Sequence, residues 1–164
     1  MEIVIILHNI RSILNVGSIF RTAEGFGIKK IYLTGYTPNP ESGLPHVREK
    51  ISKQLHKTAL GAEDLVKYEY NSNVVKIITS LKKQSYKIVG LEQDEKSVML
   101  PDYRPNQSKI ALLLGEEVNG IDPELRKVCN DIIEIPMFGQ KESFNVSVAT
   151  GIALYHLATT LPSS

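Results

Sequence analysis

The sequence predicts an α/β fold in which a mostly parallel sheet carries helices on both faces. Five short runs rich in Ile, Val and Leu are apolar at consecutive positions, which is typical of strands buried on both sides of a parallel sheet. Segments with apolar residues at helical spacing separate these runs. Because 164 residues can bury one core and no repeat or linker composition interrupts them, we predict a single domain over residues 1–164.

The predicted strands extend from the start of the chain to residue 136. They cover residues 2–7, 30–34, 86–92, 109–114 and 131–136. Two proline-containing segments, residues 34–46 and 96–108, are predicted to be irregular loops. Long loops in a compact domain are often functional and often only surface connections, so both interpretations stay open here.

Helices are predicted between these strands from the 3.6-residue period. Residues 15–27 repeat apolar side chains at helical spacing and end in two glycines, and residues 73–85 have the same period. In residues 121–129, Asp122 is a natural N-cap and Pro123 suits the first helical position. The last helix, which begins after Asn145, is apolar around most of its circumference, so we expect it to be buried on more than one side.

Composition excludes several classes of protein. The net charge of +1 neither favours nor excludes nucleic acid as a partner. Cys129 is the only cysteine, so no intrachain disulfide exists, and a lone thiol suits a reducing, cytoplasmic setting. No run approaches the roughly 20 apolar residues of a membrane span, and the first residues lack the features of a signal peptide. The four histidines lack ligand spacing, so we predict no metal site.

Three polar clusters each follow a predicted strand. They are residues 15–21 (NVGSIFR), 114–122 (LGEEVNGID) and 137–145 (MFGQKESFN). In open α/β sheets, ligands bind at the carboxyl ends of the strands, so the three loops could form one pocket. Each cluster also has a simpler explanation. Asn15 and Asn145 could be helix caps, Glu117 a solvated acid, and Arg21 a surface cation.

Common nucleotide and hydrolase motifs are absent. The stretch GFGIKK resembles the start of a dinucleotide fingerprint, but it precedes a strand and has Lys30 at the third glycine position. Neither a Walker A sequence nor a G-x-S-x-G elbow occurs. The sequence therefore argues against nicotinamide enzymes, nucleotide hydrolases and serine hydrolases of the common kinds.

Taken together, NVGSIFR, LLLGEEVNGI and IPMFGQKESFNVSVATGIALY resemble the three motifs of the TrmH (SpoU) branch of the SPOUT RNA methyltransferases. The resemblance runs from the first strand to the last helix. It implies S-adenosylmethionine as cofactor and methyl transfer to a ribose 2′-hydroxyl of RNA, and we expect tRNA rather than rRNA because a single domain must recognise the RNA itself. It also implies a homodimer and a deep C-terminal trefoil knot, which chains normally avoid.

The resemblance also implies roles for individual residues. The active-site positions correspond to Asn15, Arg21, Glu117, Ser143 and Asn145. Positions around the cofactor correspond to Leu114, Gly115, Ile135, Met137, Phe144 and Asn145. The second motif usually reads GNEGxG in the family but GEEVNG here, so Glu116 and Val118 put the conformation of this loop in question.

Arg21 is expected at the reacting hydroxyl. A guanidinium is a very poor base because its pKa exceeds about 12, so Arg21 could act as base only in unusual surroundings, or else hold a phosphate and stabilise the alkoxide. Asn15 and Arg21 are six residues apart and do not share a helix face, so we expect them to meet only around a ligand, with help from a second subunit. Ser143 and Asn145 are expected to cap the last helix.

A basic segment at residues 46–57 is the candidate RNA contact outside the motifs. It contains Arg48, Lys50, Lys53 and Lys57 in a helical-looking stretch, and a solvated basic face is the alternative. Two rival functions also stay open. One is a non-catalytic RNA-binding member of the family, and the other is an unrelated flavodoxin-like nucleotide-binding protein.

Overall fold

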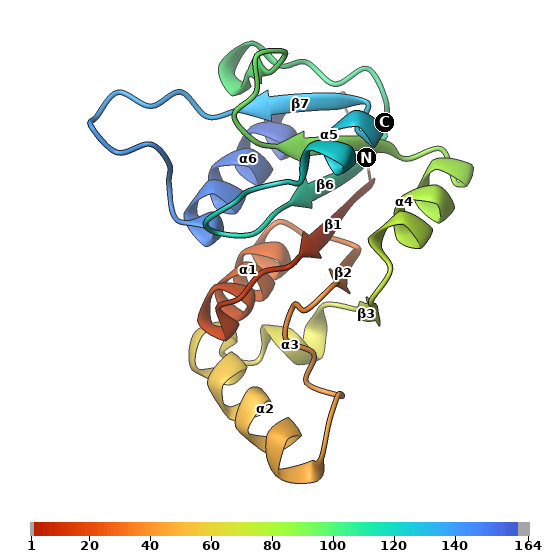
Figure 1. Ribbon diagram of the computed structural model, residues 1–164, viewed down its shortest axis with the longest axis vertical. Coiled ribbons are helices and arrows are strands. Elements are labelled where there is room, and N and C mark those ends of the chain that lie inside the picture. The colour runs from red at the N-terminus through yellow and green to blue at the C-terminus, as the bar shows by residue number, and fades with distance from the viewer. Residues whose placement is uncertain (1, 161–164) are drawn as a thin grey trace.

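A computed structural model describes residues 2–160, and within this range one sheet of seven strands forms the centre of the molecule (Figure 1). The strands are β1 (Glu2–His8), β2 (Lys30–Thr34), β3 (Tyr68–Asn71), β4 (Lys87–Leu91), β5 (Val98–Met99), β6 (Lys109–Leu114) and β7 (Asp131–Glu134). Their order is β3-β2-β1-β6-β4-β7-β5, and every neighbouring pair is parallel. The prediction of a mostly parallel sheet is confirmed.

All five predicted strands are present, and the two that the sequence did not reveal lie at the edges of the sheet. β3 (YEYN) is partly exposed along its length, and β5 is two exposed residues inside the predicted loop 96–108, followed by a short 3₁₀ helix (Leu100–Asp102). An edge strand needs no continuous apolar run, because it pairs with only one other strand and its faces are only partly covered by helices.

The helices are α1 (Ile13–Gly25), α2 (Pro45–Ala59), α3 (Ala62–Leu65), α4 (Val74–Lys83), α5 (Pro123–Val128) and α6 (Val146–Thr160). Asp122 caps α5 and Pro123 begins it, as predicted. Asn15 is not a cap: the Ser12 side chain accepts the hydrogen bond from Asn15 N, so α1 begins before the predicted segment. The basic segment forms most of α2, which packs against α1.

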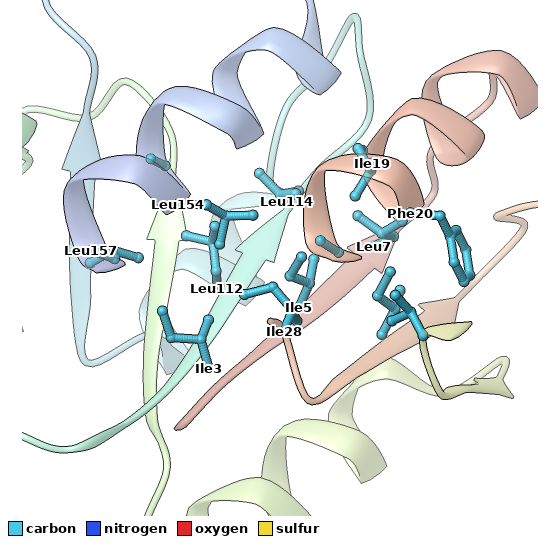
Figure 2. Close-up of a cluster of buried hydrophobic side chains, with 14 of the residues drawn as sticks. Ile3, Ile5, Leu7, Ile19, Phe20, Ile28, Leu112, Leu114, Leu154 and Leu157 are labelled. Atoms are coloured by element: carbon cyan, nitrogen blue, oxygen red, sulfur yellow. The ribbon is translucent and has the colours of Figure 1, made fainter. Parts of the chain in front are cut away.

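Helices cover both faces of the sheet, as predicted. On one face, side chains of α1 and α6, such as Leu154 of α6, pack on alternate residues of β1 and β6, such as Leu7 and Leu112 (Figure 2). On the opposite face, α4 and α5 pack on the intervening residues, such as Val4 and Leu113. The sheet is therefore buried between two cores, which explains the uninterrupted apolar runs of its central strands.

The last helix has one buried side and one apolar side that this chain leaves open. Thr150, Ala153, Leu154 and Leu157 are buried. Val148, Ile152 and Tyr155 are 50%, 36% and 63% exposed. Within one chain the helix is therefore buried on one side only, not on more than one side as the sequence led us to expect. The trefoil knot that the resemblance implies stays a prediction.

Candidate functional site

A cavity of about 270 Å³ opens at the carboxyl ends of the central strands. Its lining residues lie within segments 91–93, 114–120, 134–137 and 142–149, which follow β4, β6 and β7 and lead into α6. These three strands are neighbours in the sheet, so their loops converge at one edge. This is the place where parallel α/β sheets bind ligands.

Glu117 ties the loop after β6 to the start of α1. Its carboxylate accepts hydrogen bonds from the backbone N–H of Arg11 (2.9 Å) and of Ser12 (3.0 Å), and from the side-chain amide of Asn15 (3.2 Å). Burial alone would raise the pKa of Glu117, but these hydrogen bonds outweigh it, so the pKa lies below its ordinary value. Glu117 is thus an ionised carboxylate that holds two loops together.

The same network reaches the third polar cluster through two asparagines. Asn145 donates from Nδ2 to Oδ1 of Asn15 at 3.2 Å. Its own Oδ1 accepts from the backbone N–H and the hydroxyl of Ser147, so it also caps α6 as predicted. The chain Glu117–Asn15–Asn145 therefore joins all three clusters that the sequence singled out.

The loop after β6 closes as a tight turn. Backbone hydrogen bonds join Glu116 and Gly120 in both directions, at 3.1 and 2.8 Å. Gly120 takes the left-handed position (φ 68°), and a Cβ on Gly115 would lie 2.4 Å from the Gly120 backbone. Val118 is 75% exposed and has negative φ, so a side chain fits where the family usually has glycine.

Two residues after β4 complete the site, and the sequence did not reveal them. The Glu92 carboxylate accepts from the backbone N–H of Ile121 (2.7 Å) and of Gln93 (2.8 Å), and the Gln93 amide donates to the carbonyl of Glu142 (2.5 Å). Both line the cavity. Their segment matches no motif, and the one available signal was its position, because Glu92 is the last residue of the predicted strand 86–92 and Gln93 follows it.

The expected cofactor positions fall around the cavity with one exception. Leu114, Gly115, Ile135, Met137 and Phe144 line it, whereas Asn145 does not. Ser143 also lines the cavity instead of capping α6, since Asn145 is the capping residue. Four further glutamates besides Glu117 contribute to the lining: Glu92, Glu116, Glu134 and Glu142. The cavity thus combines apolar walls with several carboxylates.

Arg21 and the basic residues of α2 lie apart from this cavity. Arg21 is exposed on α1, and neither it nor Asn15 lines the cavity. Arg48, Lys50, Lys53 and Lys57 are exposed on α2, where Lys53 pairs with Glu49 at 2.7 Å. One chain therefore brings Asn15, Glu117, Ser143 and Asn145 together but leaves Arg21 outside the group.

The described residues, 2–160, include no cluster of three or more His, Cys, Asp or Glu side chains that could hold a metal ion. No helix in the same range is both long and apolar enough to cross a membrane.

Comparisons with known proteins agree with this geometry. The model of the SpoU rRNA Methylase family matches residues 2–155. The chain is 30% identical over 154 residues to the 23S rRNA (guanosine-2′-O-)-methyltransferase RlmB of Xanthomonas axonopodis pv. citri, covering 93% of this chain and 57% of that protein. It is 29% identical to the tRNA (guanosine(18)-2′-O)-methyltransferase of Aquifex aeolicus, covering 94% of this chain and 67% of that protein.

A solved structure of an AdoMet-bound rRNA methyltransferase from Sinorhizobium meliloti matches with a TM-score of 0.85 at 25% identity, over 99% of this chain and 57% of that one. The chain thus spans little more than half the length of the RlmB relative and of this structure. The flavodoxin-like alternative is wrong, because the family model matches nearly the whole chain. With its three motifs joined around one cavity, the chain belongs to the SpoU rRNA Methylase family.

Proposed function

We propose that this protein transfers a methyl group from S-adenosylmethionine to a ribose 2′-hydroxyl of RNA, in the cytoplasm. The observation that carries the proposal is the hydrogen-bonded chain Glu117–Asn15–Asn145 beside the cavity after β6 and β7. The relatives include enzymes named for 23S rRNA and for tRNA, so both RNA classes are candidate substrates.

The volume and the lining residues of the cavity support cofactor binding. Its volume is close to the lower end, about 300 Å³, of typical small-molecule sites. Leu114, Ile135, Met137 and Phe144 offer apolar contacts to an adenine ring, and the close approach of Gly115 to the Gly120 backbone keeps the turn at the edge of the cavity tight. When bound, S-adenosylmethionine supplies a methyl group on a positively charged sulfur, which suits a cavity edged by carboxylates.

The chain's own residues have to position the hydroxyl and remove its proton. Glu117 and Asn15 hold the loops at a fixed spacing, so the ribose meets a preformed edge. Ser143 and Asn145 stand where α6 begins, at the boundary between the cavity and solvent, and offer polar contacts to the ribose. Arg21 supplies the positive charge that stabilises a developing alkoxide or holds an RNA phosphate.

We further propose that Arg21 acts across a homodimer. In one chain Arg21 does not line the cavity, so the proposal is that the Arg21 of a second copy reaches the reacting hydroxyl. The exposed apolar side of α6 (Val148, Ile152 and Tyr155) is the surface that would bury itself in that dimer. Exposed apolar side chains at positions i, i+4 and i+7 of one helix are typical of such contacts.

Titration calorimetry with S-adenosylmethionine and S-adenosylhomocysteine tests cofactor binding first. We expect saturable binding of both, followed by new 2′-O-methyl nucleosides when the protein is incubated with total tRNA or ribosomal RNA and the digest is analysed by mass spectrometry. A protein that binds RNA but neither cofactor form would be the non-catalytic member of the family.

Light scattering tests the homodimer. The Ile152→Arg variant should be a monomer, because it places a charge on the exposed apolar side of α6.

Mixing two inactive variants tests the shared site. Arg21→Ala and Glu117→Ala damage different parts of the site, so a randomly mixed dimer has one intact site only if Arg21 serves the partner's cavity. Activity should return to about one quarter of wild type, since half of the dimers are mixed and each has one intact site of two. If Arg21 serves its own cavity, mixing restores nothing.

A further inference from the structure

Arg11, Tyr36 and Glu116 form a cluster at the edge of the cavity that the motifs do not explain. Glu116 lines the cavity, and its carboxylate lies 3.7 Å from the Arg11 guanidinium and accepts from Asn119 Nδ2 at 2.6 Å. Tyr36 is 54% exposed, and its partial burial together with the nearby Glu116 carboxylate raises its pKa. The Arg11 side chain is 64% exposed.

The backbone beneath Tyr36 is held in a demanding conformation. Asn9 is one of three non-glycine residues within residues 2–160 that have positive φ (59°), and Gly35 has φ 63°. Asn9 Oδ1 accepts from Tyr36 N at 3.1 Å, and a Cβ on Gly35 would lie 1.8 Å from that oxygen. Tyr70 donates from its hydroxyl to the Gly35 carbonyl at 2.8 Å. Asn and Gly adopt left-handed φ more readily than other residues, and these contacts fix the path of the loop that carries Tyr36.

A single exposed tyrosine is ordinary on a protein surface. Here, however, the loops after β1 and β2 place an exposed ring near the exposed guanidinium of Arg11, which pairs with Glu116, at the same edge of the sheet as the cavity. Aromatic rings and guanidinium planes are the groups on which proteins stack unpaired RNA bases. A ribose that reaches the cavity brings its own base or a neighbouring base to this edge.

We propose that the ring of Tyr36 stacks on a base of the bound RNA beside the methylated ribose, with Arg11 as its cationic neighbour. Glu116 acts as a positioning residue, because it holds Arg11 and lies beside Tyr36 at the edge of the cofactor cavity. The proposal rests on the proposed function of the cavity and adds a residue that recognises the substrate.

The absence of tryptophan from the chain makes a direct test possible. Tyr36→Trp creates a single fluorescent indole at the proposed contact, and Val75→Trp places one at an exposed position on α4. Total tRNA and total ribosomal RNA should each be titrated into both variants. We expect saturable quenching for Tyr36→Trp with one pool or both and none for Val75→Trp, because a base stacked on the indole quenches it and the indole on α4 lies outside the proposed contact.

Two substitutions of Tyr36 distinguish base stacking from a general loss of apolar contact. Tyr36→Phe keeps the ring and should bind RNA within about twofold of wild type, whereas Tyr36→Leu keeps apolar bulk without a π face and should weaken RNA binding about 5- to 100-fold. Cofactor affinity should not change in either variant. Wild-type RNA affinity in Tyr36→Leu, or equal quenching at positions 36 and 75, overturns the proposal.

The two proposals fail separately. If the wild-type chain methylates RNA but the indole at position 36 is not quenched, the stacking contact is wrong and the proposed function stands. If the indole is quenched but neither pool is methylated, the contact stands and the enzymatic function is wrong.

Discussion

The two ends of the sheet use carboxylates in opposite ways. At the carboxyl end, Glu92 and Glu117 accept from backbone N–H groups of loops, at 2.7 to 3.0 Å. At the amino end, Glu2 accepts from the Tyr86 hydroxyl and pairs with Lys29, and Asp131 accepts from the Tyr103 hydroxyl (2.6 Å) and pairs with Lys87 (2.6 Å).

This contrast explains how the loops around the cavity are held. Glu92 and Glu117 bind backbone donors, so they fix the paths of the loops that line the cavity. Glu2 and Asp131 bind side chains, so they neutralise charge at the surface and fix no loop of this cavity. Burial, together with Asp131 in one case and Glu2 in the other, raises the pKa of Tyr103 and of Tyr86, so both stay protonated donors.

The largest effect is expected for Glu117→Ala, which breaks the carboxyl-end network. The substitution removes the acceptor for two backbone N–H groups and for Asn15, so the loops lose their fixed spacing. Methyl transfer to RNA should fall about 100-fold or more, equivalent to about 2.7 kcal/mol of transition-state stabilisation. Asp131→Asn at the other end should leave the rate within about threefold, and equal losses in the two variants would contradict the comparison.

Gly120→Ala should act next most strongly, through cofactor binding. Gly120 has positive φ, which an alanine adopts only with strain, and a Cβ there would meet the Glu92 carboxylate at 1.9 Å. Glu92 would therefore have to give up its hydrogen bond to Ile121 N beside the turn that edges the cavity. We expect cofactor affinity to fall about tenfold in calorimetry, or about 1.4 kcal/mol. Gly25→Ala is the matched control, because a Cβ there meets nothing within 4 Å. Unchanged affinity in Gly120→Ala would show that the turn tolerates a side chain.

Tyr103→Phe tests the amino end and should change stability without changing function. The substitution removes the hydrogen bond to Asp131, so the free energy of unfolding should fall by about 1 kcal/mol in urea titrations. Cofactor affinity should stay within about twofold of wild type, because the residue lies at the opposite end of the strands. A loss of affinity with no loss of stability would reverse the roles given to the two ends.

The smallest effect is expected on the free energy of unfolding when the pH is lowered. Because the pKa of Glu117 is lowered on folding, its contribution to stability is present above the unfolded value of 4.5 and is lost as the pH falls through the lower folded value. The difference in unfolding free energy between wild type and Glu117→Gln should therefore shrink below pH 4.5. A difference that stays constant down to pH 3 would show that the carboxylate charge is not what holds the loops.

Much of the fold could be predicted because buried strands and helix faces require apolar residues at regular positions in the sequence. The central strands are covered on both faces, so their apolar runs are visible without a structure. The edge strands β3 and β5 lack such runs, since solvent covers part of each. Helix boundaries followed capping residues where those were unambiguous, as at Asp122, whereas Ser12 was missed because the motif began at Asn15.

The sequence by itself determined the fold class, the three polar clusters and the family to which they point. Only the tertiary structure decided how they meet. The hydrogen bond between Asn15 and Glu117 joins residues that are 102 positions apart in the sequence, and the one between Asn15 and Asn145 joins residues that are 130 positions apart. Glu92 belongs to no motif at all. Strand order brings β4, β6 and β7 together, and that order depends on packing between segments distant in sequence. A local pattern cannot contain it, because the partners of each loop are chosen only when the sheet has formed.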